Sequence, residues 1–462
     1  MLALSYRRIV SLALPISLQA LLTSSLSVVD IYMVSSLGSA AVAAVGLISK
    51  VYFVALLIAI GLSGGVSMLV AQYWGASDRI AVLGYLWTGL AWCGLAMLPL
   101  TVMALFFTQP MAGLLSPDDT VAGMAANYWF WTFPFAALSG FSFLLASVQR
   151  ATGDTLWPMA ASGLALLTNT LLNYLVLFGP FPVLNIGLAG VAFASVASRV
   201  LELALLLFLL RRHLQVIWVW SADRFWEVWR YGRVLMLNEG LWSAGIFAFF
   251  LVYAYMGAAP LAAMSLMSPL ENVIVDLFIG FGIAASILIG QHLGRHEYDE
   301  ARALCYFFLN KITLASALLA VALASMTPLV VGVFAFVEAP VRDLLAGVWL
   351  VYCIGLPVRT HNMLAVIGIL RAGGDNRFVL LTEAISLWLL AVPVSALVAL
   401  WLGWPLWAVV GVTVLEELGK VALFRWRTGR GYWLRNLTSK PGSDVMSNRL
   451  QFKLSGRLVR SG

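Results

Sequence analysis

Long apolar stretches recur along the whole of this chain, and short stretches with Gly, Pro and charged residues separate them. A helix needs about 20 apolar residues to cross the hydrocarbon core of a bilayer, and most of these stretches reach that length. The pattern predicts an all-α integral membrane protein with twelve transmembrane helices, at residues 9–36, 45–72, 81–108, 122–148, 157–179, 186–210, 234–256, 265–291, 309–334, 344–370, 378–402 and 405–424.

Composition supports this reading and excludes a soluble protein. Hydrophobic residues make up 62% of the 462 residues, and charged residues make up only 11%. Mean hydropathy is +0.93. Because a soluble domain carries roughly a quarter charged residues, we expect the lipid bilayer to surround most of this chain.

Basic residues are distributed unevenly between the two sides of the predicted membrane. The termini and the connections on their side hold 23 of the 28 Lys and Arg residues, whereas the connections on the other side hold one, Arg342. Basic connections stay in the cytoplasm. We therefore expect both termini to be cytoplasmic, with the protein in the cell (inner) membrane. The net charge of +7 then reflects topology and the anionic inner leaflet, and not binding to nucleic acid.

An internal repeat divides the chain into halves. A shift of 219 residues aligns residues 38–79 with residues 257–298 without a gap, and thirteen of the 42 positions are identical. A second match, at an offset of 221 residues, pairs QRATGD (149–154) with LRAGGD (370–375). Six spans per half give both halves the same orientation. The predicted fold is therefore two six-helix bundles related by a pseudo-two-fold axis along the membrane normal.

Two pairs of glycines in this repeat have expected packing roles. Gly61 and Gly280 fall inside spans, where a small residue lets two helices approach closely. Gly75 and Gly294 lie where a helix meets the cytoplasm, and that position suits a glycine C-cap.

The repeat also sets the expected domain boundaries, with an N-terminal bundle at 1–210 and a C-terminal bundle at 234–425. Residues 211–233 mix Trp with Arg, and we expect them to form an amphipathic linker helix at the inner interface. Residues 426–462 are polar, basic and rich in Ser and Gly. We expect this cytoplasmic tail to be disordered or loosely attached to lipid head groups.

A parallel repeat of this kind favours a transporter over an enzyme or a simple channel. Such repeats place the substrate between the halves of alternating-access carriers. The chain has no GxxxxGK[ST] phosphate loop, and we find no nucleophile–base or metal-ligand set of the kind that enzymes use. We therefore expect a carrier that needs no cofactor and hydrolyses no nucleotide.

Several motifs, in the same order along the chain, resemble those of the multidrug and toxic compound extrusion (MATE) family. This family contains the drug exporters of a larger superfamily of flippases and exporters. The resemblance covers residues 5–425 and leaves the tail outside. The residues that carry it are Pro15, Gln19, Asp30 and Gly38 in the first helix, Asn169, Asn173, Gly187 and Gly190 in the fifth and sixth, LNEGLW (237–242), GILRAGGD (368–375), and Trp388 and Pro393.

The resemblance implies a secondary active antiporter that exports small organic compounds, often cationic and amphipathic, in exchange for H⁺ or Na⁺. One intramembrane arginine stands against several acids, and this favours cationic or neutral cargo. We expect a monomer. The alternative within the superfamily is a flippase or exporter of lipid-linked or other endogenous metabolites.

A charge inside the hydrocarbon costs several kcal/mol, so each such residue is a functional candidate. Asp30 lies about six residues from the outer end of the first predicted helix, and Asn173 lies at a similar depth in the fifth, with Asn169 one turn deeper. A carboxylate flanked by two amides can hold a proton when neutral or bind a small cation when ionised. These positions match the family's N-terminal coupling site, with H⁺ the preferred ion and Na⁺ the alternative. The competing interpretation is a polar packing residue satisfied by the amides.

The C-terminal half offers a less regular set of polar residues. Its candidates for the substrate cavity are Glu239 and Asp276 in the seventh and eighth helices, and Arg359, His361 and Asn362 in the tenth. One branch of the family has a sodium site built from acids in the seventh and tenth helices. The tenth helix here has no carboxylate, so we assign no metal site. An unpaired arginine would be costly at this depth, so we expect Arg359 to pair with Glu239 or Asp276.

Two amides complete the expected cavity lining. Gln19 and Asn238 are related by the 219-residue offset, so each half presents an amide at one depth. We expect both to face the cavity, together with aromatic residues that suit flat cations.

Other intramembrane charges have the spacing of local ion pairs on one helix face. Arg199 and Glu202 are three residues apart, and Glu416 and Lys420 are four apart. Glu383 has no local partner and is as well suited to line the cavity as to be packed.

Overall fold

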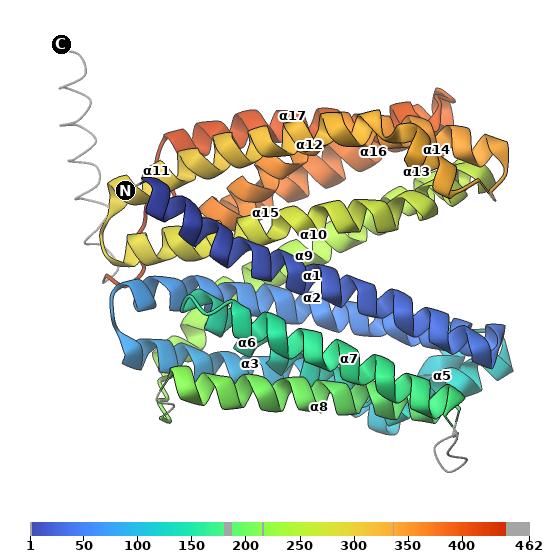
Figure 1. The fold of residues 1–462 in the computed structure, drawn as a ribbon, viewed down its shortest axis with the longest axis horizontal. Helices are drawn as coiled ribbons and strands as arrows, with labels where there is room; N and C mark the ends of the chain where they lie inside the picture. The colour runs from blue at the N-terminus through green and yellow to red at the C-terminus, as the bar shows by residue number, and fades with distance from the viewer. Residues whose placement is uncertain (1, 180–186, 215–216, 336, 440–462) are drawn as a thin grey trace.

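Long helices that run roughly side by side make up the molecule (Figure 1). The structure is a computed structural model, and it describes residues 2–179, 187–214, 217–335 and 337–439. Over these residues it contains helices and connections but no strand. The predicted all-α class is confirmed.

The N-terminal bundle consists of helices that pack around α2 and α6. Its helices are α1 (Leu2–Val34), α2 (Ser39–Gly75), α3 (Arg79–Phe106), α4 (Thr108–Leu115), α5 (Asp119–Trp131), α6 (Phe135–Ala151), α7 (Leu156–Phe178) and α8 (Leu188–His213), with a short 3₁₀ turn η1 (Ser35–Leu37) after α1.

The C-terminal bundle packs around α10 and α14. In the described part of the chain, all the π-helical segments lie in this half, where two of them interrupt a longer helix and the other two end one. Its elements are α9 (Ala222–Met256), α10 (Ala258–Gly294), α11 (Tyr298–Phe307), η3 (Phe308–Ile312), α12 (Thr313–Ser325), α13 (Thr327–Val333), α14 (Ala339–Met363), η4 (Leu364–Leu370), α15 (Asn376–Ile385), η5 (Ser386–Ala391), α16 (Val392–Ala396), η6 (Leu397–Trp401) and α17 (Leu406–Gly429).

These helices supply the twelve predicted spans. Among the described residues, ten helices are long and apolar enough to cross a membrane, and α5 with α6 forms an eleventh span that is bent by 50°. We expected a single unbent span there. Pro134 stands at the break, and its ring removes a backbone donor and disfavours a continuous helix. The predicted twelfth span, 405–424, is occupied by α17, which carries five charged residues and is not among those helices.

The two halves pack through equivalent helices. α1 lies on α10, α9 lies on α2, and α2 and α10 cross each other. Gly61 on α2 touches the backbone of Met236 on α9, and Gly280 on α10 touches Ala13 and Ser17 on α1, so a larger side chain at either glycine would collide. The predicted role of these two glycines in close helix packing is confirmed.

The glycine C-caps predicted at Gly75 and Gly294 are wrong. The left-handed backbone conformation lies two residues further on, at Ser77 (φ 64°) and His296 (φ 62°). Gly75 instead lies against the backbone of Gln291, and Gly294 lies against that of Gln72. Each glycine is therefore needed because another helix passes too close for a Cβ, and not because of its own backbone angles.

The halves are tied together at the end of the molecule where α1 begins and α17 ends (Figure 1). Gln72 Nε2 donates to the carbonyl of Ala372 over 2.8 Å, and Gln291 Nε2 donates to the carbonyl of Ala151 over 2.9 Å. We call this the basic end, because the predicted basic connections lie here. Toward the opposite end, the ribbons of the two bundles diverge (Figure 1).

Residues of the predicted linker 211–233 are divided between two long helices. α8 continues to His213, and residues 222–233 form the first turns of α9, continuous with the span that follows. They pack on α3, where the Trp92 ring stacks on Phe225 and Trp229 at 4.4 and 4.6 Å between centroids. Because the helix does not stop at 233, the bundle boundary lies between α8 and α9.

The beginning of the predicted tail is folded. α17 continues to Gly429, and the Trp433 side chain after it is buried. Asn436 Nδ2 donates to the carbonyl of Leu293 over 2.8 Å, and the Leu437 amide donates to Gln72 Oε1 over 2.6 Å. The expectation of a loose tail is therefore wrong for residues 426–439, while residues 440–462 lie outside the described residues.

Candidate functional site

The three residues expected to couple transport to a cation lie together between α1 and α7. Asn173 Nδ2 donates to Asp30 Oδ1 over 2.9 Å and to Asn169 Oδ1 over 3.1 Å. Asn169 and Asn173 are one helical turn apart, so they share the face of α7 that packs on α1. We call these residues the Asp30 cluster.

The Asp30 cluster also reaches α8 and is closed to solvent at its amides. Asn169 and Asn173 expose 1% and 0% of their surface. Asn169 Nδ2 lies 3.5 Å from Ser195 Oγ on α8. The oxygen of the Asn173 amide accepts no hydrogen bond from the described residues. A single carboxylate with amide donors around it can exist either ionised or protonated, and that choice is what ion coupling requires.

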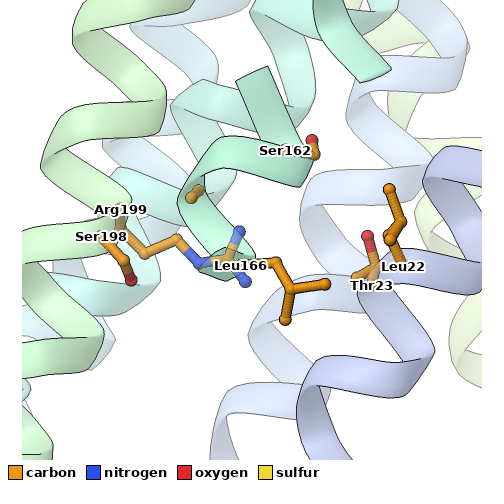
Figure 2. A pocket seen from close by; sticks show the side chains of 7 residues that line it. Leu22, Thr23, Ser162, Leu166, Ser198 and Arg199 are labelled. Carbon is orange, nitrogen blue, oxygen red and sulfur yellow. The ribbon is translucent and has the colours of Figure 1, made fainter. Parts of the chain in front are cut away.

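A small cavity lies between α1, α7 and α8, and Leu22, Ala165 and Leu166 form the apolar part of its lining (Figure 2). Its volume is about 10 Å³, enough for about one water molecule. Thr23, two turns before Asp30 on α1, lines one side, and Ser162 on α7 and Ser198 and Arg199 on α8 line the others. Figure 2 shows the Arg199 side chain extending from α8 toward α1.

Gln19 bonds inside the N-terminal bundle. Its Nε2 donates to Ser162 Oγ over 2.8 Å, and its Oε1 accepts from Arg150 Nη1 over 2.9 Å. Arg150 is the second residue of the QRATGD turn, at the end of α6. The amide therefore links α1 to both α6 and α7.

Asn238 makes the corresponding contact in the C-terminal bundle. Its Nδ2 donates to Glu383 Oε2 on α15 over 2.8 Å. Glu383 is the counterpart of Ser162 at the 221-residue offset, just as Asn238 is the counterpart of Gln19 at 219. In each half, the predicted cavity amide thus bonds the equivalent helix of its own bundle.

Arg359 pairs with Glu271 on α10, and not with Glu239 or Asp276 as expected. Arg359 Nη2 also donates to Thr413 Oγ1 over 3.0 Å, and the guanidinium lies 5.0 Å from the centre of the Tyr352 ring. The expected pairing was wrong because the partner of Arg359 depends on how α10 is rotated about its axis relative to α14. The residue pattern of one helix does not predict that rotation.

The two acids expected to partner Arg359 bind elsewhere. Asp276 Oδ2 accepts from Ser24 Oγ on α1 over 2.6 Å, which links the two halves within the membrane. Glu239 Oε1 lies 3.0 Å from Arg371 Nη2, in the turn before α15.

His361 and Asn362 are packed inside the C-terminal bundle, where they expose 2% and 4% of their surface. His361 Nδ1 lies 3.4 Å from the carbonyl of Leu309 in η3. Asn362 Nδ2 donates to Glu417 on α17, with 2.5 Å to the Oε2 atom. No three His, Cys, Asp or Glu side chains in the described ranges converge to hold a metal ion.

Both local ion pairs predicted from spacing are confirmed. Arg199 Nη1 lies 2.6 Å from Glu202 Oε2, and Lys420 Nζ lies 3.1 Å from Glu416 Oε1. Lys420 also lies 2.6 Å from Glu417 Oε1, a partner that sequence reasoning missed.

Sequence reasoning also missed Arg150 as the partner of the Gln19 amide and Arg371 as the partner of the Glu239 carboxylate. A signal for them was present, because the 221-residue offset pairs Arg150 with Arg371 and, continued further, Arg199 with Lys420. Both halves therefore carry a basic residue at each of these two equivalent positions.

Comparison with known proteins gives a family match in each half of the chain. The family described as MatE matches residues 15–175 and again residues 236–397. These two ranges agree with the two bundles and with the repeat.

Relatives of the chain include annotated multidrug resistance proteins. A probable multidrug resistance protein NorM from Synechococcus is 25% identical over 429 residues, covering 86% of this chain and 88% of that protein. The match to the probable multidrug resistance protein YoeA of Bacillus subtilis, 26% identical, spans 58% of this chain and 59% of that protein. An FAD transporter of Shewanella oneidensis is 26% identical, covering 69% and 72%.

Solved structures share the fold. A mutant of the Vibrio cholerae MATE transporter VcmN superposes with a TM-score of 0.82 at 20% identity, covering 93% of this chain and 98% of that chain. A MATE protein in complex with MaL6 superposes with a TM-score of 0.84 at 18% identity, covering 92% and 96%.

Proposed function

Because this chain belongs to the MatE family, whose members are membrane transporters and not enzymes, we propose that it is a secondary active antiporter. It exports small organic compounds, chiefly cationic and amphipathic ones, in exchange for H⁺. The two bundles expose a site between them alternately to each side of the membrane, as parallel repeats allow. Membership of the family implies small-molecule cargo and a place in the bilayer. We propose in addition the direction of transport, the coupling ion and the cargo class.

The proposed orientation places the basic end in the cytoplasm of the cell, in the inner membrane. The bias of 23 basic residues on one side against one on the other supports it. The ties between Gln72 and Ala372 and between Gln291 and Ala151 then close the cytoplasmic side, and the bundles diverge toward the outside. The protein acts as a monomer, because the two halves of one chain already form the pseudo-symmetric pair.

The Asp30 cluster is the observation that carries the proposal. An intramembrane carboxylate is costly, and here the buried amide of Asn173, which also bonds Asn169, donates to it. A carboxyl group beside these amides can hold a proton when neutral, so we propose H⁺ as the coupling ion, with Na⁺ as the alternative.

The test is dye efflux by the purified protein in liposomes. We expect an imposed pH gradient to drive ethidium transport, and Asp30→Asn, which keeps the shape of the side chain, to reduce the rate at least tenfold while the thermal unfolding temperature stays close to that of the wild type. Asp343→Asn, on the opposite side of the membrane from the basic connections, serves as the control.

A Na⁺ gradient without a pH gradient is the second arm of this experiment. If a Na⁺ gradient alone drives transport, the coupling ion is Na⁺ and not H⁺. Full activity of Asp30→Asn, or failure of both gradients to drive any cationic dye, would overturn the proposal.

A second cargo class follows from one specific relative, the FAD transporter of Shewanella oneidensis. Export of an endogenous anionic metabolite, or flipping of a lipid-linked one, is the alternative function. The same liposomes loaded with FAD test it. Gradient-dependent loss of FAD without loss of ethidium would assign the protein to that class.

A further inference from the structure

The Arg199–Glu202 pair is part of a longer chain of hydrogen bonds, although its spacing alone suggests only a local contact. Glu202 Oε2 lies 2.6 Å from Arg199 Nη1, and Glu202 Oε1 accepts from Ser162 Oγ over 2.7 Å. Ser162 accepts from Gln19, which in turn accepts from Arg150. Glu202 exposes only 4% of its surface, so it is held entirely by these partners.

This chain and the Asp30 cluster both reach α8, one through Arg199 and the other through Ser195, which lie one helical turn apart on the same face. We call the two together the polar column, with Asp30, Asn173, Asn169 and Ser195 in the outer half and Arg199, Glu202, Ser162, Gln19 and Arg150 toward the basic end. The cavity of about 10 Å³ is lined by both Arg199 and Thr23, and the Leu166 side chain lies between them in Figure 2. Arg199 therefore stands one turn of α8 away from the residue that contacts the Asp30 cluster.

The charges of the polar column balance in one protonation state only. Two bases, Arg199 and Arg150, face two acids, Glu202 and Asp30, when Asp30 is ionised. A proton on Asp30 leaves one excess positive charge. Since the interior of a membrane protein penalises uncompensated charge, the position of Arg199 must respond to that proton.

Resting on the proposed function, we propose that Arg199 is a positioning residue shared between Glu202 and Asp30. When a carboxylate oxygen of Asp30 holds the proton, Arg199 is held by Glu202, as in this structure. When Asp30 is ionised, the guanidinium is drawn past the cavity toward it. The guanidinium keeps its own proton throughout, because arginine is not deprotonated in proteins.

Movement of Arg199 would affect the packing of three helices of the N-terminal bundle. Glu202 is bonded to Ser162 on α7, and Ser162 is bonded to Gln19 on α1. When Arg199 leaves Glu202, the carboxylate loses its main partner and these bonds rearrange. The proton on Asp30 thereby changes how α8, α7 and α1 hold together.

The C-terminal bundle lacks an equivalent of the Asp30–Arg199 arrangement. Lys420 stands at the position equivalent to Arg199 and is paired with Glu416 and Glu417. The position equivalent to Asp30 is Phe249, which cannot take up a proton. The second half keeps the buried base but lacks the acid that would move it.

Few other ionisable groups face Asp30 from the helices packed around it. α10 contributes Asp276, held by Ser24, and α5 contributes the phenol of Tyr128, whose ordinary pKa near 10 leaves it neutral. α7 contributes the two amides, and α8 contributes Arg199 and Glu202.

The test is the dependence of ethidium efflux from liposomes on external pH, from which protons are loaded. Arg199→Gln removes a positive charge near Asp30, so we expect half-maximal transport at a pH about one unit higher. Glu202→Gln releases Arg199 to Asp30, and we expect the midpoint to move in the opposite direction, to lower pH. Arg199→Lys keeps the charge and should stay close to the wild type.

Matched variants separate this inference from a folding defect and from the proposed function. Arg212→Gln makes the same change at the exposed end of the same helix and should leave the midpoint unchanged. The double variant Arg199→Gln/Glu202→Gln leaves no unpaired charge and should keep the upward shift. If Asp30→Asn is inactive but neither single variant moves the midpoint, or both move it in the same direction, the inference is overturned. If the wild type shows no gradient-driven transport, the proposed function itself fails.

Discussion

Arg359 illustrates how an intramembrane charge of this protein depends on its partners. The guanidinium of Arg359 is held by Glu271, Thr413 and the face of Tyr352. A buried ion pair adds little net stability, but an isolated charge left behind by a broken pair is costly. The contribution of such a pair to stability is therefore best measured by removing one partner.

This reasoning predicts the behaviour of variants at Arg359. Arg359→Met leaves the carboxylate of Glu271 without its cation, and we expect it to destabilise the protein by about 3–5 kcal/mol. The double variant Arg359→Met/Glu271→Gln should recover most of that loss. Thermal unfolding in detergent measures both, with Arg211→Met at the exposed end of α8 as the control. Equal losses in the single and double variants would contradict the pairing.

Residue-level predictions from sequence succeeded where helix geometry alone decides. Two ion pairs were predictable because residues three or four apart share a helix face, namely Arg199 with Glu202 and Lys420 with Glu416. The partner of Arg359 was not, since Glu271 and Asp276 both lie on α10 and only its rotation against α14 selects between them. The Asp30 cluster was found because the family resemblance supplied the pairing of α1 with α7 that local pattern lacks.

At the scale of elements, α9 is unusual because it begins outside the span and runs into it without a break. Its first turns are fixed to α3 by the stacked rings of Trp92, Phe225 and Trp229 and by the bond from Trp92 Nε1 to the carbonyl of Phe225, 2.8 Å long. The hydroxyl of Tyr85 on α3 donates to Glu227 Oε2 over 2.5 Å. The link between the two bundles is therefore rigidly attached to the first of them.

Removing the central ring should detach this segment. We expect Trp92→Ala to destabilise the first turns of α9 by about 1–3 kcal/mol, because it removes two stacked contacts and a hydrogen bond. Hydrogen exchange of the amides of residues 222–233 should become faster than in the wild type. Trp401→Ala, a tryptophan that is 85% exposed, should leave that exchange unchanged. Unchanged exchange in Trp92→Ala would mean that the stack does not hold the segment.

The sequence predicted the number and order of elements better than their junctions. Twelve apolar runs identify twelve spans, because bilayer thickness fixes the length that each must reach. The tail was misjudged because composition averages over 426–462 and hides the single buried ring of Trp433 and the amide of Asn436, which fix its first part.

At the scale of the whole molecule, this first part of the tail contacts both halves at once. Asn436 bonds the end of α10, and the neighbouring amide of Leu437 bonds Gln72 on α2. Arg435 adds its carbonyl to the same glutamine, 3.2 Å from Nε2. The segment therefore reinforces the closed basic end.

Loss of this contact should loosen that end. Asn436→Ala removes the bonds to the carbonyls of Leu293 and Gly294, and we expect a cost of about 1–3 kcal/mol to the closed arrangement. Faster hydrogen exchange at residues 288–294 would report it. Arg430→Ala, an exposed change in the same segment, is the control. Equal exchange in the two variants would show that the segment does not hold the basic end closed.

The ties between Gln72 and Ala372 and between Gln291 and Ala151 are reciprocal, with the same side chain of each half reaching the same turn of the other. This is the contact that a two-fold homodimer of a single half would make. Two identical subunits, however, must carry every ionisable group twice or not at all. One continuous chain removes that restriction. Its two copies can keep a common interface while an aspartate stands at position 30 and a phenylalanine at position 249, so one half can carry an acid that the other half lacks.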